Sequence, residues 1–283
     1  MLSRLETYIE QLQTDPVTFL ITMAYTWGVI LLSLILHECA HGYVALKCGD
    51  PTAKMLGRLS LNPARHLDPV GTMCMFLLGF GWAKPVPVNP RNFRNYRRDD
   101  FLVSIAGVAV NLTIFAVCVL FSCVINPLLW NAELLELLQE EFGTAEVLLN
   151  PYHDWVLTFN GIEGELGAIS IMYTGHGMIP AFDLFMEHTW LICIQRALLL
   201  LAQVNLMLAI FNLLPVPPLD GFHVVNDILF KGRLMLNHHL HQITRIALMA
   251  LLFTGVLDKV LIACNTVVYQ SVLRLCITVT GQL

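Results

Sequence analysis

The sequence SLILHECAHG at residues 33–42 places two histidines four positions apart, with a glutamate directly after the first. On an α-helix, residues i and i+4 share a face, so His37 and His41 can hold one metal ion between them. Glu38 projects beside them and can take a proton from a metal-bound water. Residues 16–36 carry no charge, so the pair lies toward the end of an expected membrane helix. Ionisable groups at a bilayer centre cost about 2.5–3.5 kcal/mol, which favours a functional site over two core histidines.

The composition of the whole chain is that of an integral membrane protein. Of its 283 residues, 56% are hydrophobic and 13% are charged, and the mean hydropathy is +0.66. Soluble proteins carry about 25% charged residues. The eight cysteines form no C-x-x-C pair, so we expect neither a disulfide framework nor a cysteine zinc site. We expect the lipid bilayer as a partner and no nucleic acid.

Apolar stretches predict an all-α polytopic membrane protein with about four transmembrane helices. These stretches lie at about 16–46, 101–132, 189–214 and 246–275, the last being either one long tilted helix or two short ones. Residues 1–15 are expected to form a surface amphipathic segment, and residues 1–283 a single membrane-embedded domain. Small residues near the start of the second stretch favour close helix packing. Asn111 is expected to bond across helices there, as structural support.

The connection between the first and second spans is predicted to be irregular. Met73–Trp82 is apolar but too short to cross a bilayer. Residues 83–90 contain three prolines, which exclude a helix. We therefore expect residues 73–90 to form a re-entrant loop or a short β-hairpin, buried in protein or lining a wet cavity.

Charge asymmetry predicts the orientation of the chain. Residues 47–98 hold nine Lys and Arg, whereas residues 131–188 hold none and carry ten acids. The positive-inside rule places 47–98 in the cytoplasm and 131–188 on the opposite side. Within 131–188 we expect an amphipathic helix at Glu133–Phe142, followed by loop-like chain. A further span at 166–182 is not expected, because it would put Asp220 on the wrong face of the membrane.

A catalytic zinc ion usually has three protein ligands, so the histidine pair needs a third partner. The candidates are Asp220, His66, Asp68 and the histidines after residue 222. Asp220 is favoured, because it ends a span and follows helix-breaking prolines. Residues 222–245 are interpreted as a wet interfacial connector, in preference to a second metal site.

Four motifs of the chain resemble those of the site-2 protease family of intramembrane zinc metalloproteases, in the same order. They are HECAH at 37–41, NPARHLDPVGT at 62–72, GWAKPVPVNP at 81–90 and NLLPVPPLDG at 212–221. The resemblance covers roughly residues 20–230. It implies that one zinc ion per chain is bound by His37, His41 and Asp220, with Glu38 as the general base.

The same resemblance implies a substrate site. Asn212 would lie near the scissile bond, and Trp82, Val86 and Val88 would border the substrate groove. Family members often carry a PDZ or CBS domain, and this chain is similar to a minimal form without either.

The expected function is hydrolysis of peptide bonds in or near transmembrane segments of membrane-protein substrates, as in regulated intramembrane proteolysis. The protein is expected to be multi-pass in a bacterial cytoplasmic membrane, with its active site toward the cytoplasm; the sequence leaves its oligomeric state open. One alternative is a catalytically silent relative that binds membrane helices. A second is another membrane zinc protease, which trims lipidated C-termini and usually has a later Glu as ligand; residues 188–283 contain no Glu. A zinc transporter is a third.

Overall fold

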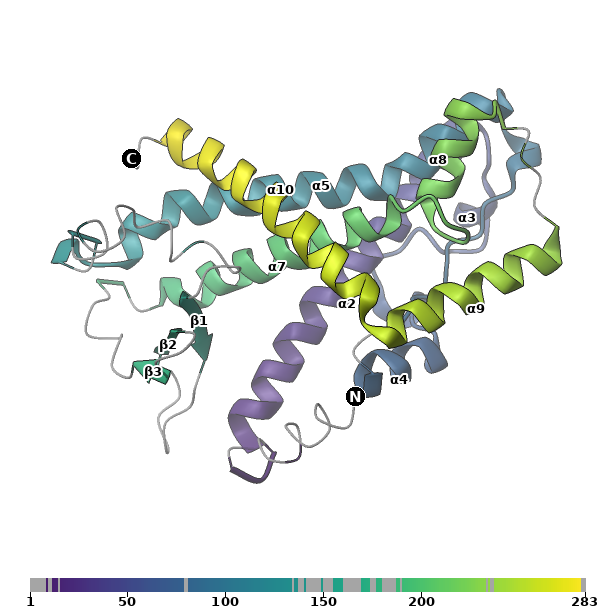
Figure 1. The fold of residues 1–283 in the computed structure, drawn as a ribbon. Coiled ribbons are helices and arrows are strands. Elements are labelled where there is room, and N and C mark those ends of the chain that lie inside the picture. The colour runs from purple at the N-terminus through teal and green to yellow at the C-terminus, as the bar shows by residue number, and fades with distance from the viewer. Residues whose placement is uncertain are drawn as a thin grey trace. The chain divides into compact units, whose positions relative to one another are not determined.

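The computed structural model of the protein describes residues 9, 12–14, 16–78, 81–133, 135–136, 140, 149, 155–159, 169–173, 177–179, 187–188, 190–232, 234 and 237–280. Its helices are α2 (Pro16–Cys48), α3 (Thr52–Met55), α4 (Pro69–Leu78), α5 (Tyr96–Leu129), α7 (Leu191–Asn212), α8 (Asp220–Leu229), α9 (His238–Thr254) and α10 (Val256–Thr280). Two 3₁₀ turns, η1 (Pro63–Arg65) and η2 (Pro90–Asn92), lie between α3 and α5. Figure 1 shows these elements along the chain.

Four helices of the described chain are long and apolar enough to cross a membrane, which confirms the predicted polytopic α-helical fold. The crossing segments are Phe19–Cys48, Tyr96–Leu129, Leu191–Asn212 and Lys259–Thr280. They agree with the predicted spans in order, and α2 and α5 are longer than a bilayer requires. The ends of both helices can therefore extend beyond the hydrocarbon core.

The last apolar stretch forms two helices, which answers the question that the sequence left open. α9 ends at Gly255, whose φ of 69° is left-handed, and α10 begins at Val256. Glycine takes this conformation without a Cβ clash and is the usual residue after a helix end. Figure 1 shows the resulting bend between α9 and α10.

The chain divides into two compact units. The first contains residues 1–30, 115–203 and 266–283, and the second contains 31–114 and 204–265. The long helices pass from one unit into the other, so each unit holds helix portions rather than whole spans. The predicted motif residues all fall in the second unit, which is therefore the unit that concerns function.

An apolar cluster forms part of the core of the second unit, around the end of α7 and the junction of α9 and α10. Its buried members are Leu219, Leu248, Leu257 and Leu261, against which Met207, Ile210, Phe211, Leu214 and Leu252 pack. A buried polar contact joins α7 to α2 in the same unit, where Nδ2 of Asn205 donates to Oγ of Ser33 over 2.9 Å. Polar contacts of this kind contribute to the association of membrane helices.

The structure corrects part of the prediction of a re-entrant loop or short β-hairpin at residues 73–90. Residues 69–78 form helix α4, with Pro69 at its first position and Asp68 as its N-cap, accepting from the N–H of Gly71 over 2.8 Å. Aspartate before an N1 proline is a strong helix start, and the prediction overlooked it. Among the described residues of this connection, strand pairing is limited to a single antiparallel bridge between Leu67 and Ala83. The proline-rich part of the segment is not helical, as predicted, and its re-entrant position stays a prediction.

The segment 131–188 is not wholly loop-like, contrary to the prediction. In the first unit, strands β1 (Trp155–Phe159), β2 (Ile169–Tyr173) and β3 (Gly177–Ile179) form an antiparallel sheet in the order β1-β2-β3. Trp155 pairs with Tyr173, and Ile171 pairs with Ile179. Strands at 169–179 agree with the expectation that 166–182 is no further span. The predicted helix at 133–142 and the surface segment 1–15 lie largely outside the described residues.

Candidate metal centre

Helix α2 presents the two histidines of the HECAH motif on one face, as their spacing predicts. Nε2 of His37 and Nε2 of His41 lie 3.0 Å apart, and the two rings meet edge to face with centroids 4.6 Å apart. His37 is 5% exposed. Two imidazoles held this close inside a membrane helix need a shared proton or a shared cation between them.

Asp220 approaches both histidines from the first position of α8. Its Oδ2 lies 3.3 Å from Nε2 of His37 and 3.2 Å from Nε2 of His41. Burial raises the pKa of the Asp220 carboxyl, but the contacts with both histidines outweigh burial and hold that pKa well below its usual range. The ionised carboxylate therefore faces the two imidazole nitrogens.

The loop before Asp220 explains why it reaches the histidines. Three prolines at 215, 217 and 218 prevent α7 from continuing, and α8 starts anew at Asp220. A Cβ on Gly221 would lie 2.2 Å from the carbonyl oxygen of Leu213, so glycine allows the loop to fold back onto the start of α8.

Hydrogen bonds at the opposite ring nitrogens orient the imidazoles. Nδ1 of His41 lies 2.7 Å from the carbonyl oxygen of Val103, so Nδ1 carries the proton and donates. When the imidazole of His41 is neutral, as a metal ligand must be, its Nε2 carries the lone pair. Nδ1 of His37 lies 3.1 Å from the side-chain amide of Asn111. Two imidazole nitrogens and a carboxylate oxygen are a ligand set that zinc prefers.

Gly107 of α5 provides the space in which the two rings meet. A Cβ at this position would lie 2.5 Å from Nε2 of His41 and 2.5 Å from Cε1 of His37. Val103, Gly107 and Asn111 are spaced by four residues, so one ridge of α5 faces the histidines. The sequence shows these three residues as an i, i+4, i+8 pattern, of which only the small residues and Asn111 predicted a helix contact.

Glu38 is held by the proline-rich segment that follows α4. Its Oε2 accepts the backbone N–H of Val86 over 2.7 Å, and Val86 is buried. Glu38 follows His37 directly on α2, and its carboxylate is near enough to His41 for an electrostatic interaction. One carboxylate oxygen is thereby fixed by the backbone next to the ligand set.

The other predicted substrate residues occupy different places in the second unit. Nδ2 of Asn212, the last residue of α7, donates to the carbonyl of Leu208 over 2.9 Å, within its own helix. The guanidinium of Arg245 lies over the ring of Trp82, with Cζ 5.8 Å from the ring centroid. Val88 follows Val86 by two positions in the same non-helical segment. Their role in substrate binding stays a prediction.

Two of the alternative ligands have other partners. His66 is 2% exposed and its Nε2 lies 2.7 Å from the carbonyl oxygen of Ser60, while Asp68 caps α4. Among the described residues, His37, His41 and Asp220 form the only group of three His, Cys, Asp or Glu whose ligand atoms lie within 4.8 Å of one another.

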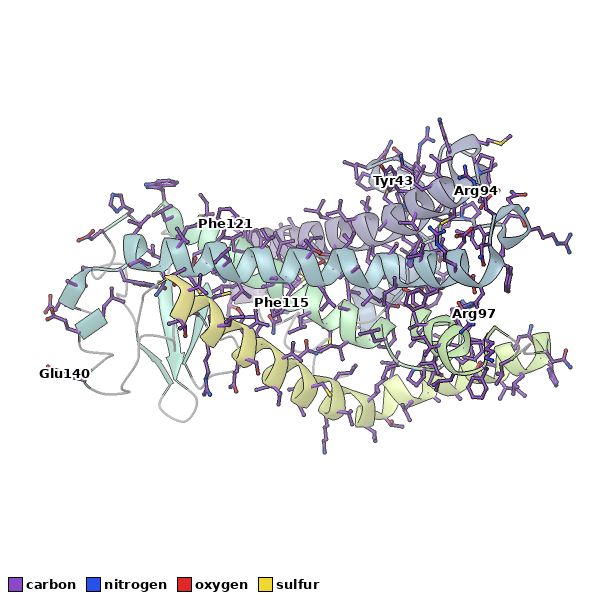
Figure 2. All side chains as sticks on the ribbon, turned by 90° about the horizontal axis from the view of Figure 1, so that it is seen from above. Tyr43, Arg94, Arg97, Phe115, Phe121 and Glu140 are labelled. Carbon is purple, nitrogen blue, oxygen red and sulfur yellow. The ribbon has the colours of Figure 1, made fainter. Side chains whose placement is uncertain are left out.

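A second group of ionisable residues, overlooked in the sequence, joins the start of α5 to α8. Nδ1 of His223 lies 3.3 Å from Oδ2 of Asp100, which raises the pKa of His223. Asp227, one helical turn after His223, is 2% exposed, and burial together with Asp100 raises its pKa to about 6. Nε of Arg97 donates to the backbone carbonyl of Asp227 over 2.8 Å. Figure 2 shows Arg97 and Arg94 at the same end of the unit as Tyr43.

Comparison with known proteins agrees with this geometry. The sequence profile of peptidase family M50 matches residues 25–255. The chain is 36% identical over 210 residues to "Putative zinc metalloprotease YwhC" of Bacillus subtilis (strain 168). The aligned residues make up 74% of this chain and 71% of that protein. No solved structure matches the chain. With the family profile covering most of its length, the chain belongs to peptidase family M50, the site-2 protease family.

Proposed function

We propose that this protein is an intramembrane zinc endopeptidase, which hydrolyses a peptide bond in or near a transmembrane segment of another membrane protein. The observation that carries the proposal is the meeting of Nε2 of His37, Nε2 of His41 and Oδ2 of Asp220, with Glu38 adjacent on α2. Membership of a metalloprotease family supports the reaction class, and four apolar helices support a multi-pass protein.

The three clustered side chains would hold one zinc ion per chain. When bound, zinc supplies Lewis acidity, which lowers the pKa of coordinated water and polarises a carbonyl. Glu38 takes a proton from the attacking water and later gives a proton to the leaving amine. The hydroxyl thus adds to the carbonyl carbon and the proton goes to nitrogen as the C–N bond breaks. The N–H of Val86 keeps Glu38 in place during both transfers.

Cleavage of a single-span peptide by the purified protein tests the reaction. The wild-type chain should cut the peptide and contain about one zinc per chain. Glu38→Gln should keep the zinc and lose turnover by about 10²–10⁴-fold, because it removes the base and leaves the ligands. His37→Ala should lose both. Turnover that survives Glu38→Gln, or full zinc retention in His37→Ala, would overturn the assignment.

The same assay separates the alternatives. A silent relative would bind the peptide without cutting it. A protease specific for lipidated C-termini would cut only a prenylated substrate near its end. The aspartate at the third ligand position favours the site-2 reaction over that class.

Substrate binding is proposed to use the segment from Trp82 to Val88. Peptide bonds of a transmembrane helix are hidden in i→i−4 hydrogen bonds, so a substrate must unwind before cleavage. An unwound strand can bind by adding to a backbone edge, which needs little sequence specificity. Backbone groups of alternate residues in an extended chain point to the same side. The backbone N–H of Val88 would therefore point to the side on which the N–H of Val86 meets Glu38.

A photo-crosslinking residue at Val88 in the Glu38→Gln protein tests this groove. It should capture substrate near the cleavage site, whereas the same residue at exposed Lys54 should not. If no position from 81 to 90 captures a substrate that still binds, the segment is only a plug that covers the histidines.

The active site is proposed to face the cytoplasm of a bacterial cell. The nine Lys and Arg of residues 47–98 support this orientation, and the relative from a bacterium supports the setting. In a cysteine-free background, Lys54→Cys should be protected from an impermeant thiol reagent in intact cells, and Asn150→Cys should react. The reverse pattern would invert the topology.

A further inference from the structure

The two histidines need the same tautomer if both use Nε2 as a ligand. A neutral imidazole has one N–H and one lone pair, so an Nε2 that binds a metal requires the proton on Nδ1. The carbonyl of Val103 accepts that proton from His41, over 2.7 Å. His37 therefore also needs an acceptor at Nδ1, and the group at that place is the side-chain amide of Asn111.

As placed, Asn111 presents Nδ2, which is a donor, 3.1 Å from Nδ1 of His37. With this orientation Nδ1 would have to accept, and the proton of His37 would point from Nε2 toward Asp220. The other amide atom, Oδ1 of Asn111, is buried and has no hydrogen-bond partner in the described part of the chain. The oxygen and nitrogen of an amide are close in size, so a half-turn about the last side-chain bond exchanges them without repacking.

We infer that Asn111 is the positioning residue of His37, with Oδ1 accepting the Nδ1–H proton so that Nε2 is free to bind the metal. The inference rests on the zinc site proposed above. Asn111 is fully buried on α5, and it stands four residues after Gly107 on the ridge that faces both rings. A partner of this kind fixes the tautomer and the ring orientation, and its removal typically costs 10–100-fold in metal affinity.

Two substitutions of Asn111 test whether it acts as a hydrogen-bond acceptor for His37 or only fills space. Asn111→Leu has nearly the same shape and no polar atom, so zinc affinity should fall 10–100-fold. Asn111→Asp can only accept when it is ionised, and it should keep zinc affinity within about threefold of wild type or tighten it. Affinity is measured in detergent by competition with a chelating dye, on protein that elutes as a single species.

Asn205 offers a matched control. It is also a fully buried amide that contacts α2, where its Nδ2 donates to Oγ of Ser33. Asn205→Leu should therefore leave zinc affinity unchanged. If Asn111→Leu does not fold, Asn111→Ala replaces it with the same expected loss, since it also removes the acceptor.

Two results would overturn the inference. The first is an Asn111→Asp protein that loses as much zinc affinity as Asn111→Leu, because an acceptor alone would then not suffice. The second is an Asn111→Leu protein that binds zinc as wild type does. Zinc binding is read without a substrate, so a wild-type protein that binds zinc and cuts no peptide would count against the proposed function only.

Discussion

The backbone N–H of Val86 donates to Oε2 of Glu38 over 2.7 Å, although the two residues are 48 positions apart in the chain. Pro85 and Pro87 flank Val86, and proline has no N–H. Val86 is therefore the only backbone donor between Lys84 and Val88. The alternation of proline and valine places one donor opposite the proposed general base and stiffens the chain around it.

Removing that donor should affect turnover and leave metal binding intact. We expect Val86→Pro to lower the rate of peptide cleavage by about 10–100-fold. This loss is smaller than the full contribution of a general base, because Glu38 itself is still present. Zinc content should stay at the wild-type level, because the three ligands are untouched. Val86→Ala is the matched control, since it keeps the N–H, and it should retain most of the turnover. Equal losses in both variants would show that the valine side chain matters instead of the hydrogen bond.

Gly107 should tolerate no side chain. A methyl group there would lie 2.5 Å from Nε2 of His41, within the space that a metal ion and its ligands need. We expect Gly107→Ala to lose most of its zinc, measured by metal analysis of purified protein. Alanine is otherwise the better helix former by about 0.8–1.0 kcal/mol, so backbone propensity cannot explain such a loss.

Gly28 provides the control for that substitution, because it also lies in a membrane helix and a Cβ there would have no atom within 4 Å. Gly28→Ala should keep zinc and be neutral or slightly stabilising in thermal unfolding. Zinc retention in Gly107→Ala would mean that the two rings can move apart and that their close packing is not required.

Asp50 should be essential for the fold of the segment that holds Glu38. It is fully buried two residues after the end of α2, and it accepts from the N–H of Asn89 and from Nδ2 of Asn92, each over 2.7 Å. Burial raises the pKa of Asp50, but the hydrogen bonds outweigh it and lower that pKa. In Asp50→Asn one carboxylate oxygen becomes an NH₂ group, which cannot accept from Asn89 or Asn92. The loss of this buried hydrogen bond should lower the free energy of unfolding by about 1–3 kcal/mol.

Thermal unfolding in detergent measures the loss at Asp50. Asp68→Asn is the matched control, because Asp68 caps α4 and asparagine is an equally good N-cap. The control should unfold close to the wild-type temperature. A melting temperature for Asp50→Asn equal to that of the control would show that the buried carboxylate contributes nothing net.

The sequence predicted the histidine pair, Asp220 and the spans because each depends on short-range rules. The spacing of His37 and His41 follows from helix geometry, and the four spans follow from length and apolar composition. The prolines before Asp220 marked the break at which a side chain can turn inward.

What the sequence did not predict depends on contacts between distant segments. The carbonyl of Val103 and the N–H of Val86 are backbone groups that any residue carries, so composition cannot reveal their partners. Residues 73–78 of helix α4 were predicted as part of a re-entrant loop or short hairpin, because the apolar stretch was judged by its length alone and the N-cap at Asp68 was not considered. The pair of carboxylates at Asp100 and Asp227 is separated by 127 positions, and no local pattern joins them.

That carboxylate pair leads to a prediction about pH. Asp227 has a pKa of about 6 in the folded protein and about 3.9 in an unfolded chain. Between these values the folded state holds more protons, so the free energy of unfolding falls as pH rises from about 4 to 6, and stays lower above 6. His223 has a raised pKa, so its contribution is fully present below about 6.5 and is lost only above that pH.

Asp227→Asn should remove this dependence, because the amide has no proton to lose beside Asp100. The variant should gain roughly 1–3 kcal/mol over wild type between pH 4.5 and pH 7, as the wild-type carboxylate becomes charged and buried. The measurement is thermal unfolding of chelator-treated protein in detergent, taken as the difference between variant and wild type at each pH. This difference cancels the titration of groups that both proteins share. A constant difference from pH 4.5 to pH 7 would show that Asp227 ionises in the folded protein as readily as in the unfolded chain.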